Sequence, residues 1–176
     1  MAVLDIIRMG HPLLKARALE VPDPTDPKIA LLVADMEETM QAVGGIGLAA
    51  PQVAVPLRLV IFMVPAARAE GEGLPLTVLI NPELIPLSPA MDEAYEGCLS
   101  VPGLTGRVPR YTHLAYRGVG LDGQPIEREA HGFHARVVQH ECDHLDGILY
   151  PMRMTDASSL AYVEELRRQA VEVPED

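Results

Sequence analysis

The pattern of apolar and polar positions predicts a helix near the N-terminus, over residues 27–43. Apolar side chains recur three and four residues apart along one face: Ile29, Leu32, Val33, Met36 and Met40. Asp26 is suited to cap this helix, Pro27 fits its first position, and Gly44-Gly45 ends it. A helix with one apolar face packs that face against a core.

Between residues 57 and 124 the pattern changes to short apolar runs typical of strands. The best strand candidates are 57–64, 76–84 and 112–119, with turn signals at Glu72-Gly73, Asn81-Pro82 and Asp122-Gly123. A second helix is expected over 132–145. A third is expected to start after Thr155 or Asp156 and to carry Leu160, Val163 and Leu166 inward.

The strands cluster instead of alternating with helices, which favours an α+β fold. We therefore expect antiparallel or mixed sheets around the second helix, with an N-terminal helix and a short C-terminal helix. A length of 176 residues suits a single domain, 1–176, in which 157–176 form a C-terminal helix and tail.

Composition narrows the class of protein. A formal net charge of −11 argues against a broad DNA-binding or anionic-membrane surface, which needs clustered Lys and Arg. Two cysteines are too few for a disulfide framework. The N-terminal segment lacks the pattern of a signal peptide, and the apolar run 59–67 is interrupted by Pro65 and too short to span a bilayer. We expect a cytoplasmic protein.

The strongest chemical signal is His140-Glu141-Cys142-Asp143-His144, an HExxH motif on the second predicted helix. Residues i and i+4 of a helix lie one above the other, so both imidazoles can bind one metal ion. Phe133 and Val137 lie on the same helix face as the two histidines. Because that face is apolar, it is expected to turn the histidines toward the interior. The alternative is a solvated helix that carries two histidines and three acidic residues without a ligand.

A catalytic metal centre needs a third protein ligand. No histidine follows His144, so the third ligand is either a downstream carboxylate (Asp156, Glu164 or Glu165) or an upstream side chain. Cys98 lies in Glu96-Gly97-Cys98-Leu99-Ser100, where small neighbours allow close approach, and a Cys/His/His set suits a soft or borderline divalent metal. A buried, inert cysteine is the alternative.

A third segment, Gly45-Ile46-Gly47-Leu48-Ala49-Ala50-Pro51-Gln52, is rich in small residues that leave the backbone accessible to a ligand. Gln52 adds an amide donor suited to a developing oxyanion. The alternative is a helix end followed by a tight turn.

In their order along the chain, the segments 45–52, 96–100 and 140–144 together resemble the three signature segments of the peptide deformylases. The residues 132–139 before the motif, the early Arg8-Met9-Gly10-His11-Pro12 and Val108-Pro109-Arg110 are also similar to that family. The resemblance runs from about Ile6 to Met152.

The resemblance implies a hydrolase that removes the formyl group from the N-formylmethionyl end of newly made polypeptides. It implies one divalent ion, Fe²⁺ by expectation with Zn²⁺, Ni²⁺ or Co²⁺ as substitutes, held by Cys98, His140 and His144. A metal-activated water would attack the formyl carbon, with Glu141 as general base and acid, and with the Gln52 amide and the Leu99 N–H holding the oxyanion. The substrate-binding residues would be Gly45, Ile46, Gly47, Glu96, Gly97, Phe133 and Val137. Glu96 is expected to pair with Arg110.

Two departures from the family pattern bear on these expectations. Thr105 stands where many members have an arginine that helps to bind substrate, which puts substrate affinity or range in question. Cys142 stands where a larger apolar residue or Tyr is usual, and its helical phase favours packing over ligation.

Two other functions stay open at this stage. A zinc peptidase acting on internal bonds would need a ligand after His144, and a deformylase-like binding protein is suggested by Thr105. In some deformylases a basic C-terminal helix contacts the ribosome. Here Arg167-Arg168 are followed by the acidic end Glu172-Val173-Pro174-Glu175-Asp176, which weakens that expectation. His11, His113, His131 and His134 have no assigned role.

Overall fold

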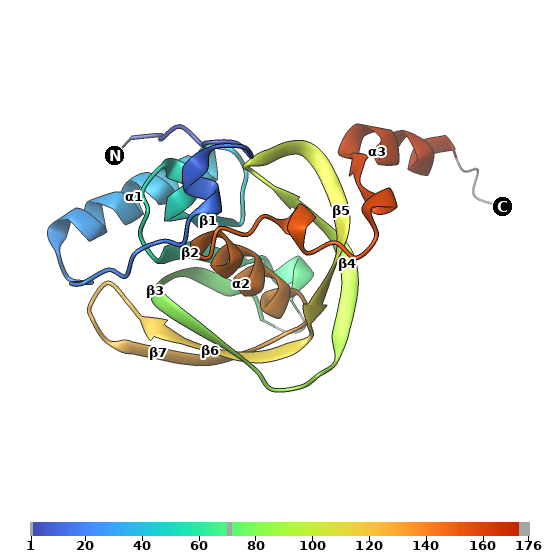
Figure 1. The fold of residues 1–176 in the computed structure, drawn as a ribbon. Helices are drawn as coiled ribbons and strands as arrows, with labels where there is room; N and C mark the ends of the chain where they lie inside the picture. Colours follow the sequence, from blue (N-terminus) through green and yellow to red (C-terminus); the bar gives the residue numbers. More distant parts are fainter. Residues whose placement is uncertain (1, 70–71, 173–176) are drawn as a thin grey trace.

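The computed structural model describes residues 2–69 and 72–172 of the chain (Figure 1). The α-helices are α1 (Pro27–Ala42), α2 (Gly132–Leu145) and α3 (Val163–Glu172). The strands are β1 (Gly47–Ala49), β2 (Leu59–Val64), β3 (Leu74–Pro86), β4 (Met91–Cys98), β5 (Val101–Tyr111), β6 (His113–Val119), β7 (Pro125–His131) and β8 (Ala161–Tyr162). Short 3₁₀ helices span Pro12–Lys15, Ala50–Val53, Ala66–Arg68, Tyr150–Met152 and Ala157–Ser159.

Two antiparallel sheets organise the molecule. The larger has the order β1-β2-β3-β6-β7, and the smaller has the order β4-β5-β8. In Figure 1, α2 crosses the middle of the molecule between the larger sheet and the β4–β5 hairpin, and it contacts β1 and β2 on one side and β5 on the other. The predicted α+β class with a central motif-bearing helix is confirmed.

Strand β2 is buried on both faces because a helix covers each of them. Val60 and Phe62 belong to a core cluster shared with α2, whereas Leu59 and Ile61 belong to a cluster shared with α1. This division follows from the alternation of side chains along a strand. The larger sheet is therefore a layer between α1 and α2.

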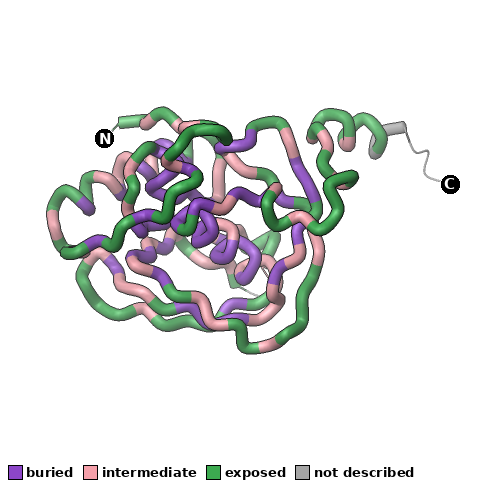
Figure 2. The backbone as a smooth tube through the Cα atoms, viewed as in Figure 1, coloured by how far each residue is buried: buried purple, intermediate pink, exposed green. Residues whose placement is uncertain are grey.

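A smaller core lies under the β4–β5 hairpin. Val101 and Val108 of β5 pack there with Leu149 and Tyr150, which follow α2 in the chain. The buried residues in Figure 2 accordingly concentrate on α2 and the strands around it, whereas α3 is mostly exposed and projects from the side of the molecule. The hairpin thus closes over the face of α2 that carries the histidines.

The third helix begins later than predicted. Residues 157–159 form a 3₁₀ turn capped by the Asp156 side chain, and Ala161–Tyr162 then pair with β5 before α3 starts at Val163. The Asp156 carboxylate accepts a hydrogen bond from the Ser158 N–H at 2.9 Å, and such a local bond competes with helix formation. Leu160 is exposed and does not point inward, so that part of the prediction is wrong.

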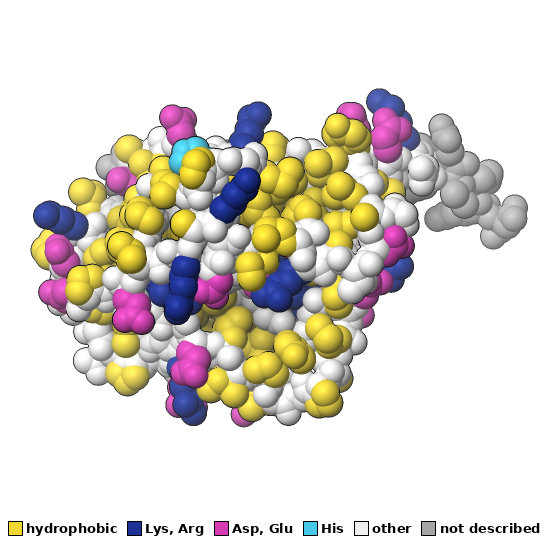
Figure 3. Space-filling model, viewed as in Figure 1, with side chains coloured by type: hydrophobic (Ala, Val, Ile, Leu, Met, Phe, Trp, Pro, Cys, Tyr) yellow, Lys and Arg dark blue, Asp and Glu magenta, His cyan; other side chains and the backbone are white. Residues whose placement is uncertain are grey.

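None of the helices in residues 2–69 and 72–172 has the length and apolar character needed to cross a bilayer. On the face drawn in Figure 3, Lys and Arg side chains stand singly with acidic groups among them, and they do not gather into a basic patch. The acidic end over residues 173–176 lies outside the described part of the chain.

Candidate active site

Helix α2 and the end of β4 bring three potential metal ligands together. The Sγ atom of Cys98 lies 3.4 Å from Nε2 of His144, and one donor atom each of Cys98, His140 and His144 lies within 4.8 Å of the other two. The two imidazoles come from successive turns of α2, with ring centroids 5.1 Å apart. A thiol and two imidazoles form a donor set for soft or borderline divalent metals.

The surroundings of these donors fit a bound metal ion. His140 Nδ1 is 2.8 Å from the Glu96 carboxylate, which leaves Nε2 as the available nitrogen of that ring. His144 is buried, and its Nδ1 has no hydrogen-bond partner in the described residues. The nitrogen of His144 that faces Cys98 Sγ is Nε2, so a metal ion beside the thiol would be held by Nε2 of each ring.

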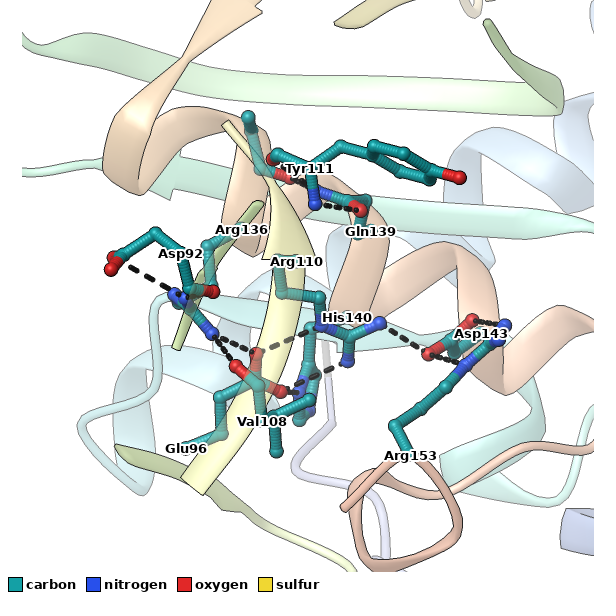
Figure 4. A network of polar contacts seen from close by, with 11 residues as sticks. Asp92, Glu96, Val108, Arg110, Tyr111, Arg136, Gln139, His140, Asp143 and Arg153 are labelled. Atoms are coloured by element: carbon teal, nitrogen blue, oxygen red, sulfur yellow. Dashed lines mark hydrogen bonds and ion pairs between the residues drawn. The ribbon is translucent and has the colours of Figure 1, made fainter. Parts of the chain in front are cut away.

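Glu96 on β4 anchors a buried network behind His140 (Figure 4). Its two oxygens accept hydrogen bonds from Arg110 Nε and Nη2 at 2.9 and 3.0 Å and from Arg136 Nη1 at 2.9 Å. Burial alone would raise the pKa of Glu96, but hydrogen bonds and charge from His140 and Arg110 lower it to about 2. The expected Glu96–Arg110 pair is confirmed, and Glu96 is an anion that orients His140.

The network extends beyond the predicted pair. Arg110 Nη1 also donates to Asp143 at 2.6 Å, and Arg153 binds the same carboxylate at 2.7 Å (Figure 4). Arg136 had no role predicted from the sequence, although its position one helical turn before His140 is a signal that could have indicated one. Asp143 and Arg153 were missed because only the folded hairpin brings them to Arg110.

Glu141 lies beside β1 and is buried. Its Oε2 has no hydrogen-bond partner in the described residues. A Cβ atom at position 47 would overlap the Glu141 carboxylate, so any residue other than glycine would displace that carboxylate. Burial is the main cause that raises the pKa of Glu141 to about 7, with the Glu96 charge adding to it and His140 and Arg110 opposing it.

Gln52 is held in one orientation toward the thiol. The Ala49 N–H donates to its Oε1 at 2.8 Å, so its Nε2 points to Ser100 Oγ at 3.2 Å and to Cys98 Sγ at 3.6 Å. The segment 45–52 therefore forms β1 and a 3₁₀ helix, and is not merely a turn after α1. The amide N–H donor of Gln52 is therefore held in place before any ligand binds.

A cleft of about 540 Å³ opens in front of these groups. It is lined by every predicted site residue except His144, which lies behind it: Gly45, Ile46, Gly47, Gln52, Glu96, Gly97, Cys98, Leu99, Phe133, Val137, His140 and Glu141. Arg68 also lines the cleft, with its guanidinium 3.7 Å from the centre of the Phe133 ring. Arg68 belongs to a segment without periodicity, so nothing in the sequence singled it out.

Comparison with known proteins agrees with this geometry. A sequence profile described as polypeptide deformylase matches residues 3–159. The chain belongs to the polypeptide deformylase family.

The relatives cover nearly all of the chain. Peptide deformylase 1 of Nitrosomonas europaea is 51% identical over 166 residues, which are 93% of this chain and 94% of that protein. A solved class I type b peptide deformylase from Acinetobacter baumannii with Met-Ala-Ser bound is 36% identical, with a TM-score of 0.81, covering 87% of this chain and 99% of that one. The Thermotoga maritima peptide deformylase is 33% identical, with a TM-score of 0.80, covering 89% and 100%.

The two departures from the deformylase pattern have structural explanations. Thr105 is buried, does not line the cleft, and donates from Oγ1 to the Glu96 backbone carbonyl at 2.8 Å. Cys142 is buried in the core between α2 and the larger sheet, and burial raises the pKa of its thiol far above the usual range. Packing, as predicted, is the role of Cys142.

The downstream carboxylates are not near the deformylase-like centre. Asp156 caps a surface turn, and Glu165 pairs with Arg168 at 2.7 Å. Within the described residues, the His/Cys/Asp/Glu groups spaced for a metal are the Cys98 group and a separate one at His113, and neither includes Asp156, Glu164 or Glu165. This removes the third ligand that a zinc peptidase would have needed after His144.

Proposed function

We propose that this protein hydrolyses the N-formyl group of N-formylmethionyl polypeptides in the cytoplasm, releasing formate and a free amino terminus. The observation that carries the proposal is the convergence of Cys98, His140, Glu141 and Gln52 on one cleft, with His144 Nε2 3.4 Å from the Cys98 thiol. Family membership supports the same activity, and the Acinetobacter relative binds Met-Ala-Ser, a peptide that begins with methionine.

Cys98, His140 and His144 would hold one divalent metal ion, with Fe²⁺ as the proposed physiological ion and Zn²⁺, Ni²⁺ or Co²⁺ as substitutes. Such an ion supplies Lewis acidity that makes water nucleophilic near neutral pH. Glu96 supports this role of His140, because its anion at Nδ1 fixes the tautomer that presents Nε2.

Glu141 is proposed as the group that moves the proton. Its Oε2 has no hydrogen-bond partner among the described residues, so it is free to accept a proton from the attacking water. The same oxygen then delivers the proton to the departing amine nitrogen. Gly47 supports this role, because the absence of a side chain leaves room for the carboxylate at the cleft wall.

Gln52 and Leu99 are proposed to hold the oxyanion that develops at the formyl oxygen. The Gln52 amide is preorganised by Ala49, so its N–H groups need no reorientation during the reaction. The Leu99 backbone N–H follows Cys98 directly in the chain, and Leu99 lines the same cleft. Loss of one such donor typically lowers kcat by about 10²–10³-fold.

The apolar part of the cleft is proposed to bind the methionine side chain. Ile46, Phe133 and Val137 supply its wall, and the backbone at Gly45, Gly47 and Gly97 leaves room for the peptide. Arg68 stacks on the Phe133 ring, with its guanidinium 3.7 Å from the ring centre. Since the Thr105 side chain is directed away from the cleft, we expect Thr105 to act on stability and not on substrate range.

The direct test is the Glu141→Gln variant, which keeps the size of the side chain but cannot take up the proton. Formate release from formyl-Met-Ala-Ser should fall by about 10²–10⁴-fold, the range of general acid–base catalysis, while the metal content stays that of the wild type. Glu127→Gln, on the exposed surface of β7, is the matched control and should keep full activity. Wild-type activity in Glu141→Gln, or cleavage of internal peptide bonds by the wild type, would contradict the proposal.

A further inference from the structure

A second group of metal-ligating side chains lies on the larger sheet, apart from the cleft. It consists of His113 on β6 with Glu129 and His131 on β7, and none of the three lines the cleft. Their inward neighbours Leu114 and Ala130 belong to the core shared with α2. By the alternation of strand residues, the three side chains stand on the opposite, outer face.

The strand register brings the two histidines together. His113 and His131 are direct partners in the β6–β7 ladder, and their rings stack with centroids 4.0 Å apart and planes 17° apart. Cross-strand partners of this kind have their side chains side by side. Both imidazoles therefore lie side by side on the outer face of β6 and β7.

Both Nε2 atoms converge on one carboxylate oxygen. Glu129 Oε2 is 3.1 Å from Nε2 of His113 and 3.9 Å from Nε2 of His131. One donor atom of each residue lies within 4.8 Å of the other two. A surface ion pair of the usual kind consists of one histidine and one carboxylate. Here Nε2 of a second histidine, His131, also faces the Glu129 Oε2 atom.

The donor atoms of these three side chains and their exposure to solvent indicate which kind of metal ion they can bind. Two imidazole nitrogens and one carboxylate suit Zn²⁺ and neighbouring transition metals, whereas Ca²⁺ and Mg²⁺ require sets made mainly of oxygen. The side chains are 30%, 65% and 56% exposed for His113, Glu129 and His131, so an ion reaches them from solvent. Because the three side chains are exposed, water can supply a further ligand from solvent.

We propose that His113, Glu129 and His131 form a peripheral site for one divalent transition-metal ion of the zinc type. Because His131 directly precedes Gly132 at the start of α2, an ion bound there connects β6, β7 and the beginning of the helix that carries His140 and His144. Binding to the folded state alone would raise the thermal stability of the protein in proportion to the logarithm of the ion concentration above Kd.

The test is a calorimetric titration with Zn²⁺ of protein that already holds one zinc ion per chain. The wild type is expected to take up one further equivalent and to show a higher Tm in excess Zn²⁺. His131→Ala and Glu129→Gln should both lose this equivalent and the rise in Tm. Glu127→Gln, equally exposed on the same strand, should keep both.

A second readout assigns the site without any measurement of activity. In NMR spectra of the zinc-loaded wild type, further Zn²⁺ should shift the imidazole signals of His113 and His131 and leave those of His11 unchanged. Absence of a second equivalent in the wild type would overturn the proposal. Retention of that equivalent in both His131→Ala and Glu129→Gln would overturn it as well.

Discussion

At the scale of single residues, the geometry of the centre depends on Glu96. This buried carboxylate accepts hydrogen bonds from Arg110 and Arg136 and contacts Nδ1 of His140, so one anion fixes two cations and one candidate ligand. Removing one member of a buried ion network leaves an uncompensated charge, which typically costs about 3–5 kcal/mol. Side chains that hydrogen-bond to a metal-binding histidine commonly contribute about 10–100-fold to metal affinity.

We therefore predict that Glu96→Gln lowers the metal affinity of the protein by about 10–100-fold and reduces its free energy of unfolding. The amide keeps the size of the side chain but loses the charge that holds His140. Metal affinity is measured by competition with a chelator, and unfolding by denaturant titration. Arg153→Gln is the control, because Arg153 binds Asp143 at the far end of the network and leaves the Glu96–His140 contact in place. Wild-type affinity in a folded Glu96→Gln variant would contradict this role.

At the scale of elements, the packing of α2 on the larger sheet contains a titratable group. His134 lies in the first turn of α2, with its Nε2 3.2 Å from the Tyr116 hydroxyl and its ring 6.1 Å from that of Phe62. Burial, together with the charges of Arg128 and His131, lowers the pKa of His134 to about 4. In the unfolded chain this histidine binds its proton near pH 6.5.

The direction in which stability changes with pH follows from this difference in the pKa of His134 between the folded and the unfolded state. Between about pH 6.5 and pH 4 the unfolded state binds the proton and the folded state does not, so stability is lost as the pH falls through this range. We predict that His134→Gln, which lacks the titration, loses less stability than the wild type between pH 7 and pH 4.5. Denaturant titrations at several pH values measure the difference. Identical pH dependence in the two proteins would show that α2 packs here without this linkage.

The elements also show what the sequence could predict. α1 and α2 were predictable because each has one apolar face, and β2 because it is apolar on both sides. β4, β5 and β7 were missed. β4 and β7 are mostly exposed, and β5 contains prolines and glycines that are typical of turns. Pairing with neighbouring strands forms all three, and for β4 the Glu96 network adds to this. β1 is too short, at three residues, to have a pattern of its own.

The same reasoning applies to the candidate site. The HExxH pair, Cys98 and Gln52 come from short segments with recognisable chemistry, and the fold brings them to one cleft. Arg68, Asp143 and Arg153 belong to segments whose neighbours carry no signal, and only the tertiary structure brings them to Phe133 or Arg110. The role of each predicted site residue in catalysis stays a prediction.

At the scale of the whole molecule, the net charge of −11 bears on how the protein reaches polypeptides that emerge from an RNA-rich ribosome. On α3, Arg168 pairs with Glu165, so one of the two basic residues that a ribosome contact would use is already paired within the helix. The family profile ends at residue 159 and leaves α3 outside it. A ribosome contact and the single-domain organisation of 1–176 therefore stay predictions.

The central claim is that one metal centre at Cys98, His140 and His144 removes formyl groups from methionyl peptides. The most direct measurement adds Fe²⁺ or Ni²⁺ without oxygen to metal-free protein and follows formate release from formyl-Met-Ala-Ser. Activity should rise with the first equivalent and stop rising there, even where the peripheral cluster takes up a further ion. Formate release that needs no metal, or no formate release at any metal content, would contradict the account.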